Sequence, residues 1–120
     1  MYDHLGIRAR DLAAAARFYD AALRALGFAG SSDEASASYG KPDSDPGLYL
    51  SQGEPGGPVH IAFRSPDRNA VDAFHAAGIA AGGRDNGAPG LREDYSPTYY
   101  AAFLFDPDGN NVEAVCTGAA

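Results

Sequence analysis

Three side chains stand out as able to do chemistry: His4, His60 and Glu113. Imidazole and carboxylate groups transfer protons and also bind divalent metals. The two histidines lie 56 positions apart, and each is followed by the pattern apolar, small, apolar, Arg. Each alone has an ordinary interpretation, a half-buried strand histidine bonded to a backbone group. Their equivalent placement favours a shared functional role.

Glu113 lies in a segment that is otherwise apolar, residues 112–116. A lone buried carboxylate is costly unless it is paired or bound to a metal, whereas on the solvated side of an edge strand it costs nothing. The sequence leaves both placements open. Cys116, in the same segment, is predicted to be a core residue, because a free cysteine packs like a small apolar side chain.

The histidines belong to a repeat that spans both halves of the chain. Residues 4–11 align with residues 60–67, and the same offset pairs Phe18 with Phe74. In each half, alternation predicts a strand whose histidine lies on the face opposite the large apolar side chains. The sequence therefore predicts two equal modules that share one fold.

A helix is predicted after each of these strands. In the first half, Asp11 is a good N-cap, apolar residues recur every three or four positions, and Gly27 is a C-cap candidate. In the second half, Ser65 and Pro66 are predicted to start the helix and Gly78 to end it.

Shorter strands are predicted after each helix, where Gly, Pro and Asp separate extended segments. The order in each half is therefore βαβββ, and residues 87–90 are predicted to form a loop over a cleft. We expect one domain over residues 1–120, with module one at about 1–53, a connector at about 54–58 and module two at about 59–120. The predicted short strands are 28–32, 35–39, 48–52, 80–84, 98–105 and 111–117.

Composition and charge exclude several classes of partner. The chain has 16 acidic and 9 basic residues, a net charge of −7, so nucleic acid and anionic membranes are disfavoured. A single cysteine excludes an intrachain disulfide and fits a reducing compartment. The first residues do not resemble a signal peptide, and no apolar run approaches the length of a membrane helix, so a cytoplasmic protein is expected.

The repeated βαβββ pattern, the opening residues 4–7 and the closing segment 105–115 resemble the vicinal oxygen chelate superfamily. That superfamily includes glyoxalase I, extradiol dioxygenases and bleomycin-resistance proteins. The resemblance implies an α+β fold in which the two modules form an open curled mixed sheet around a cleft, with the helices outside. It also implies that His4, His60 and Glu113 are metal ligands. The fourth family position falls near Tyr49, where the sequence has no carboxylate, so water, Gln52 or Glu54 would have to take that place.

The implied ligand set suits a divalent metal (Zn, Fe, Mn, Ni or Co) with positions left for water and substrate. We therefore expect a metal-dependent enzyme that chelates two neighbouring oxygens of a small substrate and stabilises an enolate or a catecholate. The missing carboxylate disfavours glyoxalase I itself, so lyase or isomerase chemistry and dioxygenase ring cleavage both stay open. The alternative is a metal-free binding protein of the bleomycin-resistance type, which the negative charge would suit.

Six further side chains are candidate catalytic or substrate-binding residues. Three tyrosine hydroxyls could orient a substrate oxygen or act as an acid, and three guanidinium groups could hold an anionic substrate. Core packing, dimer contacts and surface salt bridges explain them equally well. A homodimer is expected, because an open sheet leaves edges and a half-covered cleft. The six are Arg8, Arg64, Arg92, Tyr95, Tyr99 and Tyr100.

Overall fold

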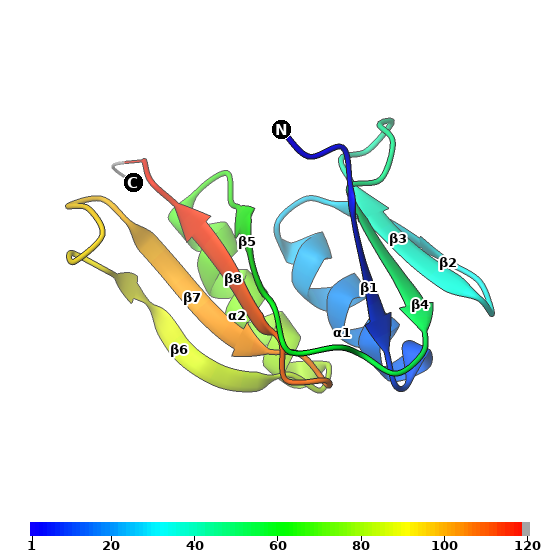
Figure 1. Cartoon of the computed structure of the whole chain (residues 1–120). Coiled ribbons are helices and arrows are strands. Elements are labelled where there is room, and N and C mark those ends of the chain that lie inside the picture. Colours follow the sequence, from blue (N-terminus) through cyan, green and yellow to red (C-terminus); the bar gives the residue numbers. More distant parts are fainter. Residues whose placement is uncertain (119–120) are drawn as a thin grey trace.

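The computed structural model describes residues 1–118 and contains the predicted repeat (Figure 1). Module one consists of β1 (Leu5–Ala9), α1 (Leu12–Ala25), β2 (Ala29–Ser32), β3 (Ser36–Gly40) and β4 (Leu48–Gln52). Module two consists of β5 (His60–Arg64), α2 (Arg68–Ala80), β6 (Arg84–Leu91), β7 (Tyr100–Phe105) and β8 (Asn111–Cys116).

Each module is a four-stranded mixed sheet with one helix on one face. The strand orders are β1-β4-β3-β2 and β5-β8-β7-β6, so the two sheets have the same topology. The first and last strands of each module pair in parallel, and the remaining pairs are antiparallel. The fold is therefore α+β with open mixed sheets, as the resemblance implies, and the strands form two sheets of four.

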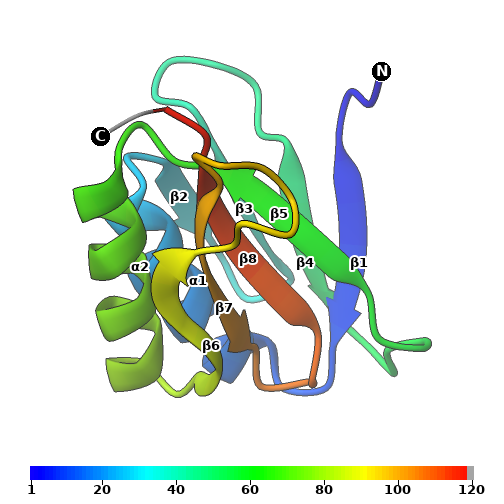
Figure 2. The ribbon, with the colours of Figure 1, turned by 90° about the vertical axis from the view of Figure 1, so that its left-hand side faces the viewer.

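The two modules contact each other chiefly through their helices. Helix α1 packs along α2, and the side chains of Phe18, Phe74 and Leu104 are fully buried. Figure 1 shows the two helices next to each other, and in Figure 2 α2 stands in front of α1. The opposite face of each sheet carries no helix and is therefore the face on which a binding site can be built. Neither helix is long and apolar enough to cross a membrane; this holds for the described residues 1–118.

The prediction for α2 was wrong at both ends. Asp67, not Ser65, is the N-cap, and its side chain accepts a hydrogen bond from the backbone N–H of Ala70. The helix continues through Gly78 to Ala80. A Cβ at Gly78 would lie 2.3 Å from Cδ1 of Leu104, so the glycine permits close packing and does not end the helix.

Strand β6 also lies later in the chain than predicted. The expected strand at 80–84 begins only at Arg84, and the expected loop at 87–90 is part of β6. Its pairing with β7 shifts register on both sides of Gly87, which has a φ of +150°. Gly and Pro in a strand are typical of such irregular, bulged pairing.

A buried polar cluster connects α1 to the turn before β8. The Tyr19 hydroxyl donates to Oδ2 of Asp106 at 2.6 Å, and Asp106 also accepts from the backbone N–H groups of Asp108 and Asn110. Burial, and then the Asp106 carboxylate, raise the pKa of Tyr19 above its usual range. The phenol therefore stays protonated and links the two modules.

Replacing Tyr19 with Phe is expected to lower the free energy of unfolding by about 1.5–3 kcal/mol, because a buried carboxylate loses a donor. Urea unfolding monitored by circular dichroism measures the change. The matched control is Tyr95→Phe, since Tyr95 is 66% exposed, and its effect should stay within about 0.5 kcal/mol. Equal stabilities for the two variants would contradict the assigned role of the Tyr19 hydroxyl.

Candidate functional site

His60 and Glu113 meet on the helix-free face of the second sheet. The parallel register aligns Ala62 of β5 with Glu113 of β8, and side chains alternate along each strand, so His60 lies on the same face. Ala62 is small and leaves space for the imidazole to reach across. His60 Nε2 lies 2.8 Å from Glu113 Oε1. Of the two placements that the sequence left open for Glu113, the buried one is correct, because the residue is only 2% exposed.

Tyr99 occupies the second oxygen of the same carboxylate. Its hydroxyl donates to Glu113 Oε2 at 2.5 Å. Burial, and then the hydrogen bond to Glu113, raise the pKa of Tyr99 to about 12. The phenol is therefore protonated at neutral pH and acts as a donor. Tyr95 packs edge-on against the Tyr99 ring, with the two centroids 4.9 Å apart.

Aromatic and cationic side chains complete this half of the face. Phe103 of β7 stands directly opposite Glu113 in the register, and its ring centroid lies 6.3 Å from that of His60. The Arg92 guanidinium lies over the Phe103 ring at 5.3 Å. Glu113 is thus enclosed, whereas the His60 side chain remains 53% exposed. A ligand could therefore reach the site from the side of the exposed His60 imidazole, whereas the Glu113 side chain is almost fully covered.

Tyr100 does not join this cluster. It follows Tyr99 directly, and alternation turns it toward α2, where its hydroxyl donates to Asp72. The Arg68 guanidinium lies over its ring. The hydrogen bond to Asp72 is the main cause that raises the pKa of Tyr100. The structure therefore separates Tyr100 from Tyr99 and places it on the helix-covered side.

His4 lies on the helix-free face of the other sheet. It precedes β1, its Nδ1 is 2.7 Å from Oδ1 of Asp3, and its ring packs edge-on against Tyr49 at 5.3 Å. The register aligns Gly6 with Tyr49 and Arg8 with Ser51, so Arg8 shares this face. These residues form a second polar patch, separate from that around Glu113.

Neither substitute for the missing carboxylate is near Glu113. Gln52 accepts a hydrogen bond from the backbone N–H of Leu12 and donates to the carbonyl of Arg10, so its amide joins β4 to the start of α1. Glu54 pairs with the Arg10 guanidinium at 3.3 Å. Both side chains therefore serve the connection between strand and helix.

The structure brings together two of the three predicted metal ligands. Within residues 1–118 of one chain, no three His, Cys, Asp or Glu side chains are close enough to hold a metal. His60 and Glu113 lie on one sheet and His4 on the other. Within the described part of one chain, His60 and Glu113 are thus together and His4 is apart from them on the other sheet.

Arg64, Cys116 and His75 lie apart from the cluster around Glu113. Arg64 is aligned with Val115 and shares the face of His60, at the far end of β5. Cys116 is buried, as predicted. His75, which the repeat pairs with Tyr19, lies on α2 and contacts Asp85 at 2.8 Å. None of these three touches Glu113.

Comparison with known proteins agrees with this architecture. The family model described as the Glyoxalase/Bleomycin resistance protein/Dioxygenase superfamily matches residues 2–114. The comparison with curated proteins found no match.

Solved structures share the fold over nearly the whole chain. A glyoxalase/bleomycin resistance protein from Albidiferax ferrireducens is 34% identical, with a TM-score of 0.74 and coverage of 96% of this chain and 97% of that one. A glyoxalase/bleomycin resistance protein/dioxygenase family enzyme from Burkholderia phytofirmans is 20% identical. Its TM-score is 0.70, and the match covers 96% of this chain and 97% of that one.

A larger protein shows the same fold in part of its length. A glyoxalase I variant from Zea mays is 22% identical, with a TM-score of 0.69, and the match covers 93% of this chain but 45% of that one. Both the family model and the relative of 34% identity extend across the two modules. The chain therefore belongs to the Glyoxalase/Bleomycin resistance protein/Dioxygenase superfamily.

Proposed function

We propose that the protein is a metal-dependent enzyme whose site is completed by a second copy of the chain. In this proposal His60 and Glu113 of one copy and His4 of the other bind a divalent metal. The observation that carries it is the buried Glu113 carboxylate, held 2.8 Å from His60 on a sheet face that no helix covers. Two such groups side by side are a typical part of a metal site.

The proposed ligand set combines residues of two copies. A single chain supplies two ligands from the second sheet, and the third imidazole lies on the first sheet. A two-fold dimer in which module one of each copy faces module two of the other would form two equal sites. Exposed Tyr49 and Tyr95 flank the two half-sites, and exposed aromatic residues are typical of interfaces.

The surrounding residues have distinct tasks in this proposal. Tyr99 holds Oε2 of Glu113, and Oε1, which faces His60 Nε2, is the oxygen that would bind the metal. Arg92 beside Phe103, and Arg8 on the opposing half, offer positive charge to an anionic substrate. A bound divalent metal would supply Lewis acidity to two neighbouring substrate oxygens. A small oxygenated molecule is therefore the proposed substrate.

The side chains of β4 around Tyr49 narrow the range of proposed reactions. Ser51 and Tyr49 occupy that part of β4, and neither offers a carboxylate as base. This disfavours the proton transfer of glyoxalase I and leaves lyase or isomerase chemistry beside extradiol dioxygenase ring cleavage. Assays with thiol hemiacetals and with catechols plus iron(II) and oxygen distinguish these reactions.

A metal-free binding protein of the bleomycin-resistance type is the second candidate. The net charge of −7 favours it, because a cationic drug would be attracted to the protein. It gives no reason for a buried carboxylate beside an imidazole. The two candidates differ in whether the protein needs metal.

Elemental analysis of the purified protein tests the proposed function. We expect about one divalent metal ion per chain, or restoration to that level after dialysis against Zn, Mn, Ni, Co or iron(II). Absence of binding at micromolar metal and neutral pH would refute the metal-dependent function. Binding of a cationic drug by the metal-free protein would then favour the second candidate.

Tyr99→Phe is expected to weaken metal binding by about tenfold, because groups that orient a ligand typically contribute 10–100-fold. Competition with a chelating dye measures the affinity. Tyr100→Phe is the control, since its hydroxyl donates to Asp72 on the helix-covered side, and it should bind metal like the unchanged protein. If Tyr99→Phe also binds normally, its hydroxyl does not orient Glu113.

A further inference from the structure

A cavity lies away from His60 and Glu113, at the junction of the two modules. Its volume is about 280 Å³. Phe28, which follows α1, and Phe63 of β5 line it from different modules, with their ring centroids 6.1 Å apart. Alternation along β5 places Phe63 on the face opposite His60. The cavity is therefore distinct from the proposed metal site.

The walls of this cavity are largely apolar and are held by backbone hydrogen bonds. Leu23 and Leu48 add aliphatic surface to the two phenylalanine rings. The loop 41–47 forms the rim, and it is fixed by hydrogen bonds from Gly47 N–H to the Tyr39 carbonyl and from Leu5 N–H to the Gly47 carbonyl. A Cβ at Gly40 would lie 2.9 Å from Cα of Pro46, so the rim is closely packed. The cavity is thus preformed, as ligand sites usually are.

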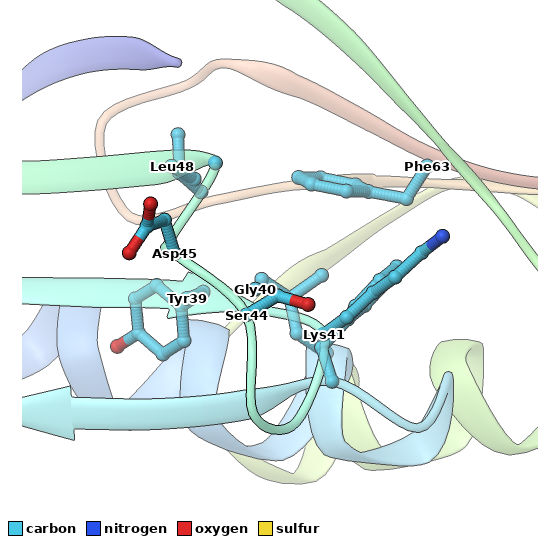
Figure 3. A pocket seen from close by; sticks show the side chains of 10 residues that line it. Tyr39, Gly40, Lys41, Ser44, Asp45, Leu48 and Phe63 are labelled. Carbon is cyan, nitrogen blue, oxygen red and sulfur yellow. The ribbon is translucent and has the colours of Figure 1, made fainter. Parts of the chain in front are cut away.

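Lys41 gives the cavity its polar specificity. It is the only lysine of the chain, and no salt bridge within 4.0 Å engages it among the described residues. Figure 3 shows its side chain extending beside Phe63, with the amino group on the opposite side of the view from Asp45. Ser44 lies between these charged groups and adds a hydroxyl. Asp45 also lines the cavity, but on the side of the view away from the Lys41 amino group. The side beside Phe63 therefore presents a cation and fits an apolar molecule with one anionic group.

We propose that this cavity binds a small aromatic carboxylate. Its ring packs between Phe28 and Phe63, and its carboxylate meets the Lys41 ammonium group at the rim. A volume of about 280 Å³ suits a single-ring molecule, since a dry cavity of about 150 Å³ already binds benzene. An aromatic cation in the same orientation would place like charge against Lys41, and only the reverse orientation would bring its charge to Asp45. The bound molecule contacts both modules, because the two rings belong to different modules.

Titration of the 15N-labelled full chain with phenylacetate tests the proposal by NMR. We expect saturable shifts of the amides around the cavity, with a dissociation constant of about 1 mM or lower. Phenylacetamide has nearly the same shape without the charge, and it should bind about threefold more weakly at low salt. Lys41→Gln should remove this preference, and Lys41→Arg should keep it. Both substitutions are at an exposed position and leave the core intact.

A variant that fills the rim of the cavity tests ligand binding without changing the charge of the protein. Ser44→Phe places a ring at the rim and should weaken phenylacetate binding at least tenfold, with the thermal unfolding midpoint unchanged. No saturable shift up to about 20 mM phenylacetate would overturn the proposal, as would shifts centred on His60 and Glu113. Dilution-dependent shifts of the cavity amides without ligand would also overturn it, because a second copy would then cover the cavity.

Discussion

Glu113→Gln is expected to lower the affinity for divalent metal at least 100-fold. The substitution keeps the shape of the side chain but removes the negative charge and its strongest donor atoms for a divalent ion. The amide can still accept from Tyr99 and pair with His60, so the sheet should keep its fold. Because even groups behind the ligands contribute 10–100-fold, loss of a ligand should exceed that range. Calorimetric titration with Zn²⁺ or Mn²⁺ gives the affinity.

The matched control is Glu54→Gln. Glu54 carries the same charge and was a possible fourth ligand, but it pairs with Arg10 at the end of the connector. Its replacement should change metal affinity less than threefold. If Glu54→Gln weakens binding as strongly as Glu113→Gln, the site is not centred on Glu113. Thermal unfolding of both variants separates loss of a ligand from loss of the fold.

Local patterns were sufficient where a single element determines its own boundaries. Strand β4 has the predicted bounds, Leu48–Gln52, because Gly47 and Gly53 interrupt the chain on both sides. Helix α1 begins after Asp11, whose side chain caps it, and Gly27 follows its end with a φ of +91°. These are interactions within a few residues, so the sequence alone contains the signal.

The second helix shows what local rules miss. Pro66 and Gly78 are ordinary start and stop signals, yet α2 begins after Asp67 and runs through Gly78. The reason for the glycine is the Leu104 side chain of β7, which is distant in the sequence. A helix terminus was therefore predicted where tertiary packing requires a residue without a side chain.

The candidate site likewise has features that could be predicted from the sequence and features that could not. The family resemblance implied that His60 and Glu113 act together, and the structure places them 2.8 Å apart. Alternation could also have separated Tyr99 from Tyr100, but only if the start of β7 were known. The position of His4 could not be predicted, because which face of one module meets another depends on helix packing between modules.

The separation of His4 from Glu113 leads to the most demanding prediction, which concerns mixed dimers. His4→Ala removes the ligand from module one, and Glu113→Gln removes it from module two. In a dimer of the proposed kind, each homodimer of either variant has two defective sites. A mixed dimer combines intact His4 from one copy with intact His60 and Glu113 from the other. One of its two sites is therefore complete.

Co-expression of the two variants with different affinity tags gives the mixed dimer. We expect about one tightly bound metal ion per mixed dimer, compared with about two for the unchanged dimer and none for either variant alone. The control pairs His60→Ala with Glu113→Gln, which damage the same half, so every site in that mixed dimer should be defective. If the two pairs bind metal equally, or if light scattering finds only monomers, the site does not combine residues of two copies. A site formed within one chain predicts no recovery in either pair, so the difference between the pairs depends specifically on exchange of modules across the interface.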